Sequence, residues 1–245
     1  MIIPAIAGFI VACAFFSPLV TGSAEALTVP ERLVYDLTWT GIKAGTATQE
    51  IVPDRDGLKI VSTARSADWI DLFFPIEDRI ETTLSGSASS ILGTPRNYRM
   101  KIREGRHRRD KEIVFRSEEA KAYYTDHLSG QKAIIPITAR TYDIYSGFYL
   151  FRFARLEVGK SVYVTILDGK EVWELEIKVL KKEKLKTKFG DVNTFLLKPQ
   201  VRSEGVFENK GEVSIWITDD DRRLPVKLQA KVMIGSIVAT LVGIR

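Results

Sequence analysis

Residues 214–228 read SIWITDDDRRLPVKL, and this stretch decides the fold class. Ile215 and Ile217 alternate with Ser, Trp and Thr before the turn, and Val226 and Leu228 alternate with Lys and Gln after it. An alternation of period two is typical of half-buried antiparallel strands. The aspartates supply hydrogen-bond acceptors for a tight turn, and the proline presets φ at the start of the returning strand. The stretch therefore predicts a β-hairpin.

Similar runs of strand-forming residues recur along the rest of the chain, separated by turn signals such as Asp56-Gly57 and Asp168-Gly169. They cover residues 33–39, 46–52, 58–64, 76–84, 98–103, 161–166, 172–179 and 237–242. No repeat, low-complexity tract or linker divides the sequence. We therefore expect residues 27–245 to form one mainly β domain, a single large curved antiparallel sheet or open barrel built as a meander.

One main helix is predicted at residues 141–155, an aromatic-rich segment whose first turn Thr141 or Asp143 can cap. Phe148 and Phe151 lie on its apolar face at helical spacing. We interpret it as a core helix packed across the curved sheet. The alternative is that its aromatic face lines a pocket for a lipid or another small molecule.

A second, shorter helix is predicted between Ser66, which can cap it, and Pro75, which stops it. Trp69, Leu72 and Phe73 would then share one face of this helix. We expect the helix to pack against the sheet and plug one of its ends. The alternative is a flap over an apolar cavity.

The N-terminal residues 1–26 have the pattern of a signal peptide. An apolar run is followed by Ala24-Glu25-Ala26, a small-x-small cleavage site, although no Lys or Arg precedes the run. We expect cleavage after Ala26, which makes the mature protein periplasmic or secreted and removes Cys13, the only cysteine. The alternatives are an uncleaved leader that anchors the protein in the membrane, or lipidation at Cys13.

The chain is basic, with a formal net charge of +5, and its most charged passage is a predicted strand. Arg99, Lys101 and Arg103 alternate there with apolar residues, which gives the strand one basic face. Such a face can be merely solvated, or it can contact an anionic lipid or glycan. Nucleic acid is not expected as a partner, because aromatic residues for base stacking are sparse there and the leader indicates export.

Motifs that carry enzymatic or metal chemistry are missing from the sequence. His107 and His127 are the only histidines, no Gly-x-Ser-x-Gly motif surrounds a serine, and no phosphate-binding loop is present. The acidic run 219–221 is offset by the two arginines that follow it. We therefore predict no catalytic residues, no metal and no cofactor. Paired carboxylates contributed by different strands leave a carboxylate-based hydrolase as an alternative.

Several motifs of the C-terminal half together resemble a known family. They are DIYSGFYLFR at 143–152, EKLKTKFGDV at 183–192 followed by LKP at 197–199, WITDDDRRLPV at 216–226 and GSIVATL at 235–241. They resemble the bacterial exported-protein family catalogued as domain of unknown function 3108, over roughly residues 28–243. The resemblance implies an exported β protein and brings no activity or catalytic residues with it.

The expected architecture is also similar, more loosely, to the lipoprotein-localisation carrier fold, an open curved sheet closed over helices. This similarity implies an apolar cavity with Arg152 and Arg155 near its mouth. The candidate lining residues are Trp69, Phe73, Phe148, Phe151 and Trp216.

The resulting functional hypothesis is a non-enzymatic periplasmic protein that binds a lipid-like or amphipathic envelope component, such as a lipid or glycolipid. Arg99, Lys101 and Arg103 are its candidate contacts with an anionic headgroup or surface. The alternative is a structural or interaction module of the envelope with a protein partner.

Overall fold

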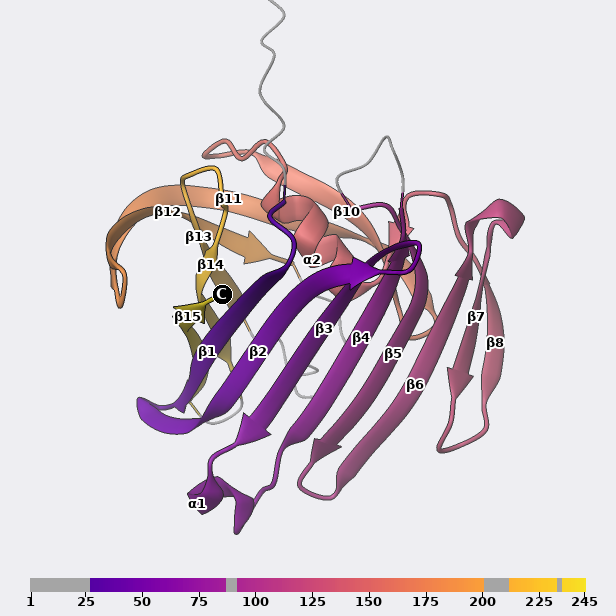
Figure 1. Ribbon diagram of the computed structural model, residues 1–245, viewed down its shortest axis with the longest axis horizontal. Coiled ribbons are helices and arrows are strands. Elements are labelled where there is room, and N and C mark those ends of the chain that lie inside the picture. Colours follow the sequence, from indigo (N-terminus) through magenta and orange to yellow (C-terminus); the bar gives the residue numbers. More distant parts are fainter. Residues whose placement is uncertain (1–26, 87–91, 201–211, 233–234) are drawn as a thin grey trace, which may run out of the picture.

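The computed structural model describes residues 27–86, 92–200, 212–232 and 235–245, which form one fifteen-stranded sheet and two α-helices (Figure 1). The strands are β1 (Glu31–Trp39), β2 (Ile42–Asp54), β3 (Gly57–Ser66), β4 (Glu77–Ser85), β5 (Thr94–Glu104), β6 (His107–Arg116), β7 (Lys121–Asp126), β8 (Lys132–Pro136), β9 (Thr141–Tyr142), β10 (Ser161–Asp168), β11 (Glu171–Thr187), β12 (Gly190–Pro199), β13 (Val213–Thr218), β14 (Pro225–Lys231) and β15 (Ser236–Ile244). The helices are α1 (Asp68–Asp71) and α2 (Ile144–Arg152), and η1 (Ser117–Glu119) is a 3-10 turn. The predicted signal peptide, residues 1–26, lies outside the described residues. Within those residues, no helix is long and apolar enough to cross a membrane.

The sheet is a meander whose two halves are joined by the first and last strands. Its order runs from β8 back to β1, continues directly into β15, and then runs back to β10 and β9. Neighbouring strands are antiparallel except β9 and β10, which are parallel. Leu37 of β1 pairs with Ala239 of β15 at the junction. The predicted single curved antiparallel sheet is confirmed.

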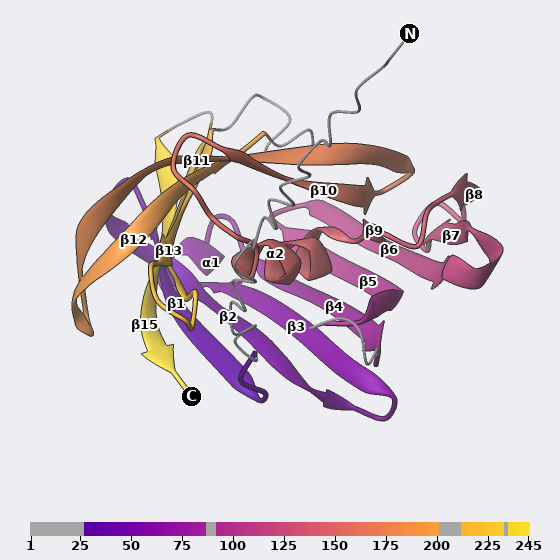
Figure 2. The same ribbon diagram turned by 90° about the horizontal axis from the view of Figure 1, so that it is seen from above.

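The sheet curls around α2, so that the helix lies inside the curve (Figure 2). Phe151 of α2 packs in a buried cluster with Ile177, Leu197 and other side chains of the C-terminal strands. Tyr149 packs in a separate cluster with Ile51 and other side chains of the N-terminal strands. The aromatic residues of α2 therefore hold the two halves of the sheet together, and the predicted core helix is confirmed.

The N-terminus of α2 is fixed to the sheet by Asp143. This carboxylate accepts hydrogen bonds from the backbone N–H groups of Tyr145 and Ser146, at 3.0 and 3.1 Å, as the predicted cap. It also accepts one from the Thr82 hydroxyl of β4 at 2.9 Å. Burial raises the pKa of Asp143. The cap therefore sets the position of the helix relative to β4, while Thr141, the other candidate cap, belongs to β9.

The C-terminus of α2 is fixed by a buried ion pair. Both terminal nitrogens of the Arg152 guanidinium contact the Glu31 carboxylate of β1, at 2.8 and 3.1 Å. Its Nε donates to the backbone carbonyl of Arg223 in the β13–β14 turn at 3.0 Å. Arg152 is fully buried, so its predicted place at a cavity mouth is wrong. Arg155 is exposed and pairs with Glu157 at 2.8 Å.

The hairpin at residues 214–228 is confirmed as β13 and β14, but its predicted half-burial is wrong. All residues from Ile215 to Thr218 are buried. Ile215 and Ile217 pack in the cluster around α2. The other face of β13 is covered as well. The Trp216 Nε1–H donates a hydrogen bond to Glu183 at 2.7 Å, and the Lys227 ammonium lies 4.5 Å from the centroid of the Trp216 ring. A strand buried on both faces cannot be recognised from alternation alone.

Candidate functional site

The helix α2 covers only one end of the concave face of the sheet. A row of inward-facing side chains crosses β2 to β6 beneath it, in register from strand to strand. These residues are all buried: Ile51, Ile60, Thr82, Tyr98 and Ile113. The strands continue well beyond α2 toward the opposite end of the sheet, where α1 lies (Figure 1).

In the next two rows of the concave face, on the α1 side, Ile80 is buried and the other side chains are partly exposed. Side chains on one face of a strand recur about every 6.6 Å, so each row lies that much farther from α2. We call seven residues of these rows the floor: Ala47, Gln49, Ser62, Ala64, Asp78, Met100 and Ile102. Ala47, Ser62 and Ala64 are small. Tyr145 of α2 hydrogen-bonds Ser62 and so covers part of the nearer row, while Ala47 and Ala64 lie in the row farther from α2.

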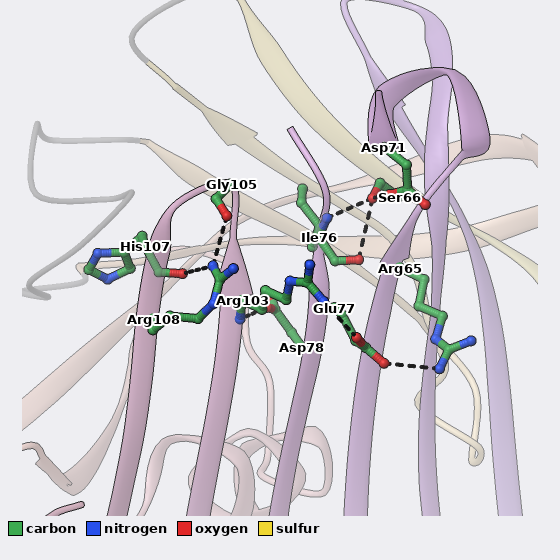
Figure 3. Close-up of polar contacts among 10 residues, drawn as sticks. All are labelled: Arg65, Ser66, Asp71, Ile76, Glu77, Asp78, Arg103, Gly105, His107 and Arg108. Atoms are coloured by element: carbon green, nitrogen blue, oxygen red, sulfur yellow. Dashed lines mark hydrogen bonds and ion pairs between the residues drawn. The ribbon is translucent and has the colours of Figure 1, made fainter. Parts of the chain in front are cut away.

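Asp78 is the carboxylate of the floor, opposite Ala64 in the strand register. Its Oδ1 accepts a hydrogen bond of 3.0 Å from the backbone N–H of Arg103 (Figure 3). Burial raises the pKa of Asp78 to about 6, with a further contribution from nearby Glu104, while the Arg103 hydrogen bond opposes the shift. The carboxyl therefore changes charge near pH 6.

Two cationic side chains of β6 lie on the same face as the floor. Arg109 is the register partner of Ile102, and Lys111 is the register partner of Met100. Asp126 of β7 follows Lys111 in the same row. The concave face thus combines a surface of small and apolar residues with two cations on β6 and the carboxylates of Asp78 and Asp126. This arrangement suits a molecule with an apolar chain and an anionic group.

The rim beyond the floor carries α1, which differs from the predicted helix. It has only four residues, and its N-cap is Ala67, which has no side-chain cap. Ser66, the predicted cap, instead hydrogen-bonds Asp71 and accepts from the backbone N–H of Ile76 at 2.7 Å (Figure 3). The sequence after Ser66 therefore forms a compact turn held by side-chain bonds.

Of the five predicted cavity-lining residues, the structure brings together only two. Phe148 and Phe151 contact each other edge to face on α2, with ring centroids 5.1 Å apart. Trp216 lies on the other face of β13 from the isoleucines that pack with Phe151. Trp69 and Phe73 are exposed near α1 and do not plug the sheet. The expectation of one cavity lined by all five residues is therefore wrong.

The predicted basic face lies on the convex side of the sheet. Arg99, Lys101 and Arg103 alternate on β5 with Met100 and Ile102, which belong to the floor on the concave face. They cannot reach a molecule bound on the concave face.

The three basic residues of that face also differ in their partners. Arg99 pairs with Asp110 at 2.5 Å and with Glu112 at 3.1 Å, so its charge is largely offset. Arg103 approaches Glu77 at 3.7 Å. Lys101 is exposed and has no ion-pair partner among the described residues.

Sequence reasoning missed the functional potential of Asp78, Arg109 and Lys111. The strand alternation already placed Asp78 on the inward side, and Arg109 and Lys111 share the phase of Ile113 along β6. This alternation alone could have predicted that the three side chains lie on the inward face of the sheet. What the sequence could not show is where along the strands the cover of α2 ends.

A surface pocket and the acidic and histidine side chains were the other candidates for a functional site. A surface pocket of about 430 Å³ lies near the β2–β3 turn, with Arg55, Arg96 and Arg116 among its lining residues. Asp54 and Asp56 line the same pocket and offset part of this charge. In the described ranges, no group of three or more His, Cys, Asp or Glu side chains is placed to hold a metal ion.

Comparisons with known proteins agree with this architecture. The family described as "Protein of unknown function (DUF3108)" matches residues 34–242. A crystal structure from Brucella abortus, described as a beta-barrel-like protein of domain of unknown function DUF1849, is similar with a TM-score of 0.56 and 12% sequence identity. The similarity covers 89% of this chain and 98% of that one, and it concerns the fold alone. No curated protein matches the sequence. The family match covers nearly all of the sheet, and the chain belongs to the DUF3108 family of proteins of unknown function.

Proposed function

We propose that this protein binds an amphipathic, lipid-like molecule of the cell envelope on the floor and catalyses no reaction on it. The observation that carries the proposal is the partial cover of the concave face: side chains beneath α2 are buried, and those of the floor are partly exposed and mostly small or apolar. An acyl chain that lies on the floor gains about 0.8 kcal/mol for each methylene removed from water.

The polar groups of the concave face suggest how such a molecule is oriented. Arg109 and Lys111 border the floor on β6 and can pair with an anionic headgroup. Asp78 lies on the same face, and its neutral form below about pH 6 leaves the net charge there more positive. The acyl chain then extends from β6 over Ala64 and Ala47.

Export to the periplasm is part of the same proposal. It is supported by the apolar run and the Ala24-Glu25-Ala26 site of the leader. A mature protein that begins at Leu27 is the expected product, and its N-terminal mass after isolation from the envelope fraction tests this. A protein that retains Met1 would show that the leader is not cleaved.

Native mass spectrometry with added palmitate tests the binding site. We expect the wild-type protein to retain palmitate and the Ala64→Trp variant to bind it about tenfold more weakly, because an indole occupies the floor. Val61→Trp is the matched control, since Val61 lies on the same strand and faces the other side of the sheet.

A second pair of measurements tests the headgroup contacts. The double variant Arg109→Gln with Lys111→Gln should weaken palmitate binding and leave binding of a long-chain alcohol nearly unchanged, because the alcohol carries no charge. The convex double variant Arg99→Gln with Lys101→Gln is the control. If the wild type retains no palmitate, or if Ala64→Trp binds it as the wild type does, the proposed site is wrong.

One observation favours a second candidate, an interaction module that pairs with a protein strand. β8 is the last strand of the N-terminal half of the sheet, and Ile134 is exposed on it. An unpaired strand edge can accept an added strand. Lys132 and Pro136 occupy the two ends of β8, and both residue types protect edges from such pairing, so lipid binding remains our first proposal.

A further inference from the structure

The end of the sheet that carries α1 exposes a cluster of large apolar side chains. Thirteen large apolar residues are exposed in the described ranges, and six of them belong to α1, the loop after it and the neighbouring β1–β2 turn. They are Trp39, Ile42, Trp69, Leu72, Phe73 and Phe74. We call Trp69, Leu72, Phe73 and Phe74 the apolar tip. Leu72 and Phe73 are the most exposed of these, at 79% and 82%.

The apolar tip is held in place by contacts on both of its sides. The Trp69 Nε1–H donates to the backbone carbonyl of Lys43 at 2.9 Å, which ties α1 to the start of β2. The Phe74 ring lies against Gly105 in the β5–β6 turn, where a Cβ on the glycine would stand only 2.6 Å from the ring. The Gly105 N–H also donates to the Pro75 carbonyl at 2.8 Å. The tip is therefore a built projection, not a loose loop.

Arg106 in the β5–β6 turn and Arg108 at the start of β6 lie next to Gly105, which contacts the apolar tip. In the part of the chain that the structure describes, the Arg108 guanidinium donates hydrogen bonds only to the backbone carbonyls of Gly105 and His107, each at 2.7 Å (Figure 3). Arg106 is exposed and has no carboxylate partner among the described residues. Asp71 of α1 accepts a hydrogen bond from the Ser66 hydroxyl. Among the described residues no carboxylate forms an ion pair with Arg106 or Arg108, and Glu104 at the end of β5 and Asp68 of α1 are the acidic residues of the same segments.

We infer that the apolar tip and the arginines of the β5–β6 turn dock this end of the sheet on the surface of an anionic lipid bilayer. Aromatic and leucine side chains enter the boundary between headgroups and acyl chains, and arginines beside them pair with anionic headgroups. Large exposed patches of apolar side chains mark interaction surfaces. A bilayer fits both parts, because it offers apolar depth to the tip and a negative surface to Arg106 and Arg108.

The apolar tip lies at the open end of the concave face. α1 lies at the end of the strands that α2 does not cover, so docking turns the open end of the floor toward the bilayer (Figure 1). This inference goes beyond the proposed function, because a lipid can bind the floor in solution without any contact between the tip and a membrane.

Vesicle co-sedimentation tests the docking surface with purified protein whose N-terminus has been determined by mass. We expect binding to phosphatidylcholine vesicles that contain phosphatidylglycerol, and about tenfold weaker binding to phosphatidylcholine alone. Leu72→Ser with Phe73→Ser should weaken binding to both vesicles about tenfold or more. Arg106→Gln with Arg108→Gln should weaken binding to the anionic vesicles only. All four side chains are exposed, so the variants should fold normally.

Matched variants elsewhere on the surface separate docking from general hydrophobicity or charge. Phe189→Ser removes an exposed aromatic residue from the β11–β12 turn, and Lys184→Gln with Lys186→Gln removes two exposed cations from β11. These variants should bind vesicles as the wild type does. The inference is overturned if the wild type binds neither vesicle, or if the tip variant binds as the wild type does.

The two proposals can fail separately. A wild-type protein that retains palmitate but does not bind vesicles would contradict the proposed docking surface without contradicting the proposed binding site on the floor. The tip variant should still retain palmitate in native mass spectra, which would show that the loss of vesicle binding does not arise from a damaged floor.

Discussion

The two ends of the concave face are built from the same strands and differ in almost every physical property. At the end covered by α2, side chains such as Ile51 and Ile113 are buried and the charges of Arg152 and Glu31 are paired. At the end near α1, the seven side chains of the floor are partly exposed, and the carboxyl of Asp78 has a raised pKa.

This difference separates stability from function along the length of single strands. Buried apolar contacts and a satisfied ion pair stabilise the covered end. The open end keeps partly exposed apolar surface and a carboxyl whose charge is unfavourable there, features that contribute little to folding. A fold retains such features most readily where a ligand or a surface uses them.

The largest expected effect comes from breaking the ion pair at the covered end. Arg152→Met leaves the Glu31 carboxylate buried without its cation and removes the hydrogen bond to the Arg223 carbonyl. We expect the free energy of unfolding to fall by about 3–5 kcal/mol. Urea denaturation monitored by circular dichroism measures this change.

Two comparisons show whether burial causes that loss. The double variant Arg152→Met with Glu31→Leu should recover much of the stability, because no isolated charge remains. Arg155→Met breaks the exposed pair with Glu157 and should change the free energy of unfolding far less than Arg152→Met does. Equal losses for Arg152→Met and Arg155→Met would contradict the distinction between a buried and an exposed pair.

A phenylalanine from each end gives the second test. Phe151→Ala removes a buried ring from the core around α2 and should cost about 3 kcal/mol or more. Phe73→Ala removes an exposed ring from the apolar tip and should change stability by less than about 0.5 kcal/mol. Thermal unfolding of both variants compares the two positions. A loss at Phe73 as large as that at Phe151 would mean that the tip is part of the core.

Much of the fold could be predicted from local sequence patterns. Alternation and turn signals identified the strands, and Asp143 marked the start of α2, because these features depend on residues close together in the chain. The pairing of β1 with β15 was not predictable in this way. It joins segments about 200 residues apart, and the sequence of either strand alone does not indicate which strand it pairs with.

The site was less predictable, because it depends on which surface another element covers. The similarity to the carrier fold implied that Arg152 lies near a cavity mouth, but only the fold brings Glu31 to it across the sheet. In the same way, Trp69 and Phe73 look like core residues by type, and the shortness of α1 leaves them exposed. Nothing in the sequence marked Ala64 as a floor residue, because a small side chain indicates open space only once the neighbouring elements are known.

The smallest effect is expected at the open end, where Asp78→Asn should stabilise the protein at neutral pH. The folded-state pKa of about 6 lies above the value of about 3.9 for an unfolded chain, so the native state binds more protons between these values. Wild-type stability should therefore fall as the pH rises from about 4 to about 6, and stay low above it. Asparagine cannot ionise, and its amide oxygen can still accept the hydrogen bond from Arg103.

The variant should be more stable than the wild type by about 1 kcal/mol at pH 7.5, because solvent screens this partly exposed carboxyl, and the difference should vanish below about pH 4. Urea denaturation across this pH range measures it, with Asp191→Asn on an exposed part of β12 as the control for removing one charge. A destabilised Asp78→Asn at pH 7.5 would mean that the ionised carboxylate stabilises the open end. The floor would then resemble the covered end, where charges are held by their partners, and the separation of stability from function along these strands would fail.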